Sequence, residues 1–212
     1  PLALTSILSL GVHPFVTFFL GRSRMPVESL AVLPVVGSMV FIFRSMGLSY
    51  QEVNIALIGK EKQNYRMLRN FAIYLGLMVT VLISLLALTP LADLWFINVS
   101  GLSAELADLS YLPLKIMILL PALTVLLNFL RSSMIINGTT GSISMATAIE
   151  LLGIIAVLFV CVNFLNLIGV VSASIAFTAG KLLSNLYLMP KQAAAVKEWN
   201  PKSRSGLSDT YT

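Results

Sequence analysis

Charged residues, cysteine and histidine are scarce in this chain. Only 11% of the 212 residues are Asp, Glu, Lys or Arg, and Cys161 and His13 are the single members of their types. One cysteine cannot form an internal disulfide, and one histidine leaves no Cys/His cluster spaced for a metal. A phosphate-binding glycine loop and a nucleophile elbow are also missing. These absences argue against an enzyme, and we expect no catalytic residue, metal site or organic cofactor.

Apolar residues dominate instead. They make up 57% of the chain, and the mean hydropathy of +0.90 lies well outside the range of soluble globular proteins. Predominantly apolar runs of about 20 residues, the length of a helix that crosses a bilayer, cover residues 1–20, 29–59, 70–88, 109–136, 143–162 and 170–189. We therefore predict an all-α, polytopic membrane protein with a lobe of six transmembrane helices (1–190) and a polar cytoplasmic tail (191–212).

The two longest spans carry internal helix breakers. Residues 29–59 contain Pro34 and Gly37, and residues 109–136 contain Pro113 and Pro121. Proline removes a helical hydrogen bond, and a span longer than the bilayer tilts or bends. We expect kinks in both helices, and cavities beside the kinks.

Lysine and arginine collect on one side of the predicted spans. That side carries Lys60, Lys62, Arg66, Arg69, Arg131, Lys191, Lys197, Lys202 and Arg204. The other side has Arg22 and Arg24, and its loop 89–108 holds three acidic residues and no cation. Cationic loops are retained in the cytoplasm, so we expect both termini on the cytoplasmic side. We expect the protein itself to be a multi-pass protein of the plasma (inner) membrane. The positive charge then reflects topology and anionic lipids, without nucleic acid.

Ionisable residues inside the spans are the informative ones, because each needs a partner, a cavity or water. Small or polar residues follow Arg44 at helical spacing on one face: Gly47, Gln51 and Asn54. This stripe either lines a water-filled substrate pathway or bonds to neighbouring helices. Glu52 lies about 80 degrees around the helix from Arg44 and is outside the stripe.

Lys115 and His13 each allow two interpretations. Lys115 lies near the outer end of the fourth span. In one interpretation it snorkels to the membrane surface or pairs with Asp108 and Tyr111, and in the other it attracts substrate at the outer mouth. His13 precedes Pro14, which bends the helix and frees a carbonyl. The imidazole either couples transport to protons or stabilises the kink as a neutral donor.

Glu150 and Lys181 are predicted to pair. The last two spans form an antiparallel hairpin that turns near Asn166, and the two residues lie 16 and 15 positions from that turn, at matching depth. The pair is either a structural salt bridge or a protonation-linked gate. Small residues on the sixth span would let the two helices approach closely: Gly169, Ala173, Ala176 and Gly180.

The intramembrane charges lean positive. The basic candidates are His13, Arg44, Lys115 and Lys181, and they are opposed by Glu52 and Glu150. If these groups share one cavity, a low dielectric magnifies their field, and the passenger is expected to be anionic.

Four segments resemble a known superfamily. "SMGLSYQEVNIALIGKEKQNYRMLRNFA" has Gly47, small and polar residues, a closing Gly59 and then a basic segment; it resembles the second helix of a six-helix lobe in MATE exporters and the wider multidrug, oligosaccharidyl-lipid and polysaccharide exporter superfamily. "FLRSSMIINGTTGSISMATAIELLGI" is similar to the cytoplasmic loop between the lobe's fourth and fifth helices. "PLAL" and "LPLKIMILLPALTV" resemble the progressive ankylosis family within it.

The resemblance implies a secondary exporter built of two such lobes around a central cavity, working by alternating access. The segment order looks like that of the second lobe, so the partner would be another lobe of the same full-length chain or of a homodimer. The chain begins with Pro rather than Met, so we expect a fragment or a processed product. Ankylosis-like proteins are associated with export of pyrophosphate, citrate and nucleotides, whereas MATE relatives expel cationic drugs in exchange for Na⁺ or H⁺.

Two alternatives stay open: a flippase for lipid-linked saccharides, and a non-transporting membrane scaffold subunit. The predicted substrate pathway consists of Arg44, Gly47, Gln51, Asn54 and Lys115. The candidates for coupling or gating are His13, Glu52, Glu150 and Lys181.

Overall fold

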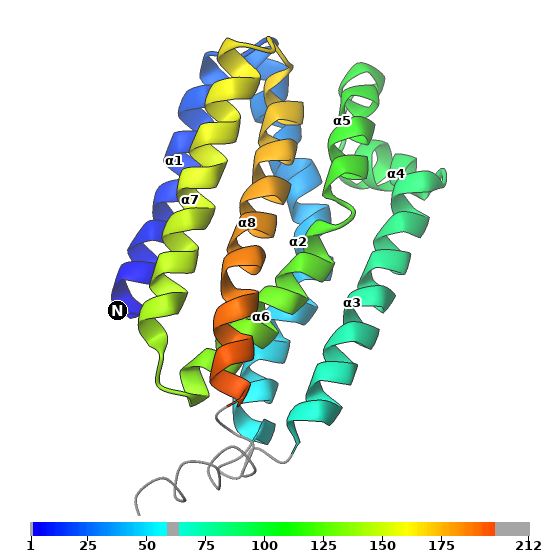
Figure 1. The fold of residues 1–212 in the computed structure, drawn as a ribbon. Helices are drawn as coiled ribbons and strands as arrows, with labels where there is room; N and C mark the ends of the chain where they lie inside the picture. Colours follow the sequence, from blue (N-terminus) through cyan, green and yellow to red (C-terminus); the bar gives the residue numbers. More distant parts are fainter. Residues whose placement is uncertain (1, 59–63, 198–212) are drawn as a thin grey trace, which may run out of the picture.

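The structure is a computed structural model that describes residues 2–58 and 64–197, with the side chains of the first helix from residue 10 onward. Its elements are α1 (Leu2–Gly21), α2 (Pro26–Ile58), α3 (Tyr65–Leu88), α4 (Leu91–Asp93), the π-helix η1 (Leu94–Val99), α5 (Ala104–Met117), α6 (Leu120–Ile136), α7 (Thr140–Asn163) and α8 (Gly169–Lys197). The predicted all-α class is confirmed (Figure 1). Lys60 and Lys62, like Lys202 and Arg204 of the tail, lie outside the described residues.

Among the described residues, four segments are long and apolar enough to cross a membrane: Pro26–Ile58, Tyr65–Leu88, Ala104–Ile136 and Thr140–Asn163. The apolar part of α1, Leu10–Gly21, is shorter. Helix α8 is not among the four, and it carries polar residues such as Lys181, Ser184 and Asn185, which are all buried against other helices. The helices are compatible with a bilayer, while the count of six spans stays a prediction.

The fourth predicted span, 109–136, is not one helix. It begins earlier, at Ala104, and a turn at Ile118 and Leu119 divides it into α5 and α6. Pro121 has no N–H to donate to the carbonyl four residues earlier, so the helical ladder cannot continue through this point. Thr178 Oγ1 of α8 donates instead to the nearby carbonyl of Ile116 at 3.4 Å. The expected kink is therefore a complete break, whereas Pro34 lies inside an unbroken α2.

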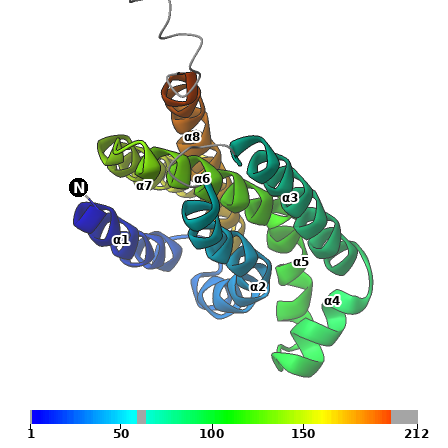
Figure 2. The same cartoon turned by 90° about the horizontal axis from the view of Figure 1, so that it is seen from below.

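Helix α6 lies in the middle of the bundle. Seen from below, it has α2, α3 and α8 around it, with α7 beside α8 and α1 outermost next to α7 (Figure 2). The predicted α7–α8 hairpin is present, and Asn166 at its turn has a φ of 49°. The left-handed region is more accessible to Asn than to most residues, which explains its place in the turn.

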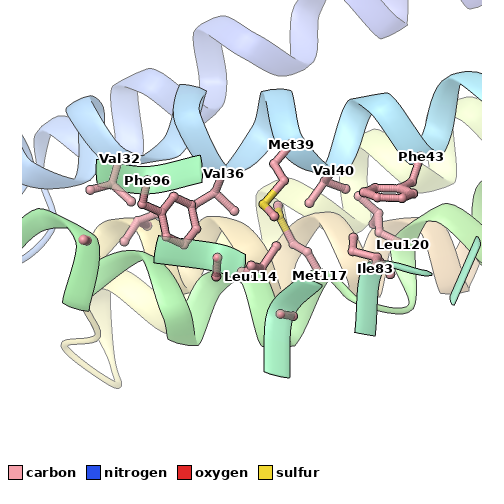
Figure 3. Close-up of a cluster of buried hydrophobic side chains, with 14 of the residues drawn as sticks. Val32, Val36, Met39, Val40, Phe43, Ile83, Phe96, Leu114, Met117 and Leu120 are labelled. Carbon is pink, nitrogen blue, oxygen red and sulfur yellow. The ribbon is translucent and has the colours of Figure 1, made fainter. Parts of the chain in front are cut away.

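An apolar core fills the bundle between α2 and the broken helix (Figure 3). Side chains of α2 meet α3, η1, α5 and the start of α6 there: Val32, Val36, Met39, Val40 and Phe43 on one side, and Ile83, Phe96, Leu114, Met117 and Leu120 on the other. Phe43 is the last residue of α2 in this core, and Leu120 is the first residue of α6. The polar residues Arg44 and Thr124 follow within one turn, so the core borders the charged interior described next.

Candidate functional site

Four helices bring charged side chains together inside the bundle. Lys181 Nζ of α8 lies 2.5 Å from Glu150 Oε1 of α7, and Arg131 Nη2 of α6 lies 3.7 Å from Glu150 Oε2. None of these three side chains is more than 18% exposed. Arg44 of α2 lies within electrostatic range of Glu150, and its Nε donates to Thr124 Oγ1 at 3.3 Å. We call Arg44, Arg131, Glu150 and Lys181 the ionic cluster.

The ionic cluster holds more positive than negative charge. Three cations face one carboxylate, a formal excess of two positive charges when all four groups are ionised. Charges buried at low dielectric are stable only when they are paired or hydrogen-bonded. Arg131 Nη2 donates to Thr147 Oγ1 at 2.9 Å, but its buried Nε has no hydrogen-bond partner among the described residues. The cluster therefore has unused capacity to bind acceptor oxygens or negative charge.

A close helix crossing places Glu150 against Lys181. A Cβ atom added to Gly180 would lie 2.6 Å from Ile154 Cγ1 and 2.9 Å from the backbone oxygen of Glu150, so a glycine is required for this distance between α7 and α8. The predicted Glu150–Lys181 pair and the close approach at Gly180 are both confirmed.

The other small residues of α8 have two different neighbours. Ala173 and Ala176 are fully buried in the apolar cluster between α1, α7 and α8. Gly169 packs elsewhere, against Ser23 and Ser29 at the α1–α2 connection. The close contact of α7 with α8 therefore depends on Gly180 more than on the start of α8.

The polar stripe of α2 faces α6. A Cβ atom on Gly47 would lie 3.0 Å from the backbone nitrogen of Val125, and Asn128 Nδ2 donates to the Gly47 carbonyl at 2.9 Å. Asn54 is fully buried, and its Nδ2 donates to Ser132 Oγ at 2.7 Å. Gly47 and Asn54 thus match the alternative in which the stripe bonds to a neighbouring helix.

Gln51 and Arg44, the remaining members of the stripe, are only half-buried. Their side chains are therefore the ones on this face of α2 that water or a solute can reach. Of the two, Arg44 belongs to the ionic cluster.

Three further predicted residues lie on the surface, outside the ionic cluster. Glu52 of α2, Lys115 of α5 and His13 of α1 are all exposed. The carbonyl of His13 accepts a hydrogen bond from Thr17 Oγ1 at 3.0 Å, and Pro14 lies inside an unbroken α1. The charged residues expected to share one cavity are therefore divided: Glu150 and Lys181 are in contact, and Arg44 lies within electrostatic range of them.

Arg131 is the cluster member that the sequence did not indicate, because it was assigned to the cytoplasmic end of its span. Partner positions on α6 were also missed. Thr124, Asn128 and Ser132 recur every four residues on one face of α6 and all contact α2. Polar residues at that spacing in an otherwise apolar helix are a readable signal for a buried polar seam.

A groove bordered by α3, α6 and α8 encloses about 1310 Å³. No member of the ionic cluster lines it. Its polar lining residues include Arg66, Arg69 and Lys197, and Gln192 Nε2 donates to the Tyr65 hydroxyl at 2.7 Å beside them. The groove and the ionic cluster are therefore separate features of the bundle.

Within the described residues, no group of three or more His, Cys, Asp and Glu side chains is placed to hold a metal ion. Comparison of the chain with known protein families, curated proteins and solved structures found no match.

Proposed function

We propose that the chain is a six-span lobe of a MATE-like secondary transporter that carries small anions across the membrane by alternating access. The ionic cluster is the observation that carries this proposal. A buried charge needs a compensating partner, because an unpaired buried charge is strongly destabilising. Three cations around Glu150 leave positive charge in excess of what that carboxylate compensates, and this excess would attract an anionic passenger.

The break between α5 and α6 supports the same proposal. Irregular backbone within a membrane is tolerated where it is buried in protein or lines a cavity, and broken helices are common at transporter binding sites. Here the N-terminal end of α6 begins one turn before Thr124, the hydrogen-bond partner of Arg44. The partial positive charge of a helix N-terminus would add to the attraction for an anion.

Glu150 is the group in the ionic cluster that a coupling proton or Na⁺ would engage. Protonation would remove the one negative charge that contacts Lys181 and Arg131 in the part of the chain that the structure describes. Both cations would then be free to bind the passenger. In this proposal the protein lies in the plasma membrane with both termini in the cytoplasm, and a second six-helix lobe completes the pathway.

Transport assays with Arg44→Ala test the proposal. The full-length protein, including any second lobe, is reconstituted in liposomes, and uptake of pyrophosphate, citrate and nucleotides is measured. Arg44→Ala should abolish uptake while the protein remains folded in the membrane, because Arg44 is half-buried and bonds only moderately to Thr124 at 3.3 Å. Lys191→Ala removes an exposed cation outside the cluster and should leave uptake unchanged. Normal uptake by Arg44→Ala would overturn the proposal.

Cysteine labelling separates a transporter from a membrane scaffold. In a Cys161→Ser background, Arg44→Cys and Gln51→Cys are treated with a water-soluble thiol reagent from each side of the membrane. A transport pathway predicts labelling from at least one side and protection by the transported anion. A scaffold predicts that neither position reacts from either side.

A further inference from the structure

The groove between α3, α6 and α8 lies beside the middle of α3. Tyr50 OH donates to the carbonyl of Leu68 at 2.6 Å near the start of this helix, and Ile83 is buried in the core near its end. In the middle, a Cβ atom on Gly76 would lie 3.9 Å from Ala122, an ordinary contact that is looser than the 3.0 Å approach at Gly47. The space left between the helices is about 1310 Å³, more than the roughly 300–1,000 Å³ typical of small-ligand pockets.

The two ends of the groove differ in chemistry. Arg66 and Arg69 lie in the first turns of α3 and Lys197 in the last turn of α8, and all three are exposed. Along the groove, away from these three cations, the lining is mostly apolar, with side chains such as Ile73, Leu77, Leu126 and Met189. The groove is therefore amphipathic along the direction that crosses the membrane.

The length of the groove matches one leaflet. Its lining on α3 runs from Tyr65 to Thr80, fifteen helical steps, or about 22 Å at about 1.5 Å per residue. Half of a bilayer, with its headgroup region, is about 20–22 Å thick. The cationic end thus falls at headgroup depth when the apolar end lies near the bilayer midplane.

We infer that this groove is a binding site for one anionic phospholipid, with the phosphate held by Arg66, Arg69 and Lys197 and an acyl chain lying between α3 and α6. Cations at the membrane surface attract anionic headgroups, and the lining residues offer that attraction only at one end. A transmembrane helix of a partner would have no use for three cations placed together at that end. The lipid site is independent of the proposed transport, because it shares no residue with the ionic cluster.

Native mass spectrometry of the full chain tests this site. The purified protein is titrated with phosphatidylglycerol or phosphatidylcholine of identical acyl chains, and the two dissociation constants are compared. We expect a roughly tenfold preference for phosphatidylglycerol, since each basic residue near an anionic headgroup contributes favourably. The triple variant Arg66→Gln, Arg69→Gln, Lys197→Gln should lose this preference, with its affinity for phosphatidylglycerol falling more than its affinity for phosphatidylcholine, whose phosphate the same side chains contact.

Two further variants isolate the groove. A matched triple, Arg22→Gln, Lys115→Gln, Lys191→Gln, removes the same charge from exposed residues elsewhere and should keep the preference. Ala122→Leu fills the middle of the groove and should weaken binding of both lipids severalfold. The assignment would be overturned if the unaltered protein bound both lipids equally or if the matched triple lost the preference. It would also be overturned if the protein formed a dimer that Ala122→Leu abolished, because the groove would then hold a second copy of the chain.

Discussion

Glu150 is the residue on which the interior electrostatics depend, because it is the carboxylate that contacts both Lys181 and Arg131. Glu150→Gln keeps the shape of the side chain and removes its charge. Breaking a buried ion pair from one side costs about 3–5 kcal/mol, since the partner charge is left without compensation. We expect the free energy of unfolding to fall by about that amount, measured by denaturation in mild detergent.

Glu52→Gln is the matched control for this prediction. Glu52 is exposed on α2, so the same chemical change there should alter stability by less than about 0.5 kcal/mol. The double variant Glu150→Gln, Lys181→Met removes both partners and should recover part of the loss. Equal stability of Glu150→Gln and the unaltered protein would show that the ion pair is not coupled to folding.

A second residue-scale prediction concerns the hydrogen bond between Asn54 Nδ2 and Ser132 Oγ, 2.7 Å long and buried. Asn54→Ala and Ser132→Ala should each destabilise the protein. The double variant should lose less than the sum, with a coupling of about 0.5–1.5 kcal/mol, because the bond can be lost only once. Strict additivity in a double-mutant cycle would contradict a direct bond between α2 and α6.

At the scale of elements, glycine sets the distance between α7 and α8. Gly180→Ala places a methyl group 2.6 Å from Ile154 Cγ1, so the helices must separate and the Glu150–Lys181 contact must lengthen. We expect a loss of about 1–3 kcal/mol in thermal or chemical unfolding, as for other overpacked sites.

Gly37→Ala provides the comparison. A Cβ atom at Gly37 meets nothing within 4 Å, and the residue lies inside α2. Alanine is the better helix former by about 0.5–1 kcal/mol, so this change should be neutral or stabilising. If both glycine variants behaved alike, helix propensity and not helix packing would govern the α7–α8 contact.

At the scale of the whole molecule, the prediction is orientation. The acidic 89–108 segment, which includes α4 and η1, lies at one end of the bundle, and the start of α3 and the end of α8, which carry Arg66, Arg69 and Lys197, lie at the other (Figure 1). In a Cys161→Ser background, Asp108→Cys should react with an impermeant thiol reagent from outside the cell. Lys191→Cys should react only after the membrane is opened. The reverse pattern would contradict the positive-inside assignment.

The sequence by itself determined the helical class and the regular features. Apolar runs of bilayer length predict helices because the backbone must satisfy its own hydrogen bonds in lipid. The Glu150–Lys181 pair could be found by counting from Asn166, since the rise per residue of a helix is constant and depth follows from position. Depth alone, however, does not fix which way a side chain points.

Only the tertiary structure decided how the helices are rotated and what they touch. It turned Arg131 inward to Glu150, left His13, Lys115 and Glu52 on the surface, and placed Gly47 and Asn54 against α6. It also interrupted the helix at Ile118 and Leu119, just before Pro121, where Thr178 of another helix donates to the carbonyl of Ile116. These outcomes depend on packing between segments far apart in the chain, and local hydrophobic patterns do not encode that packing residue by residue.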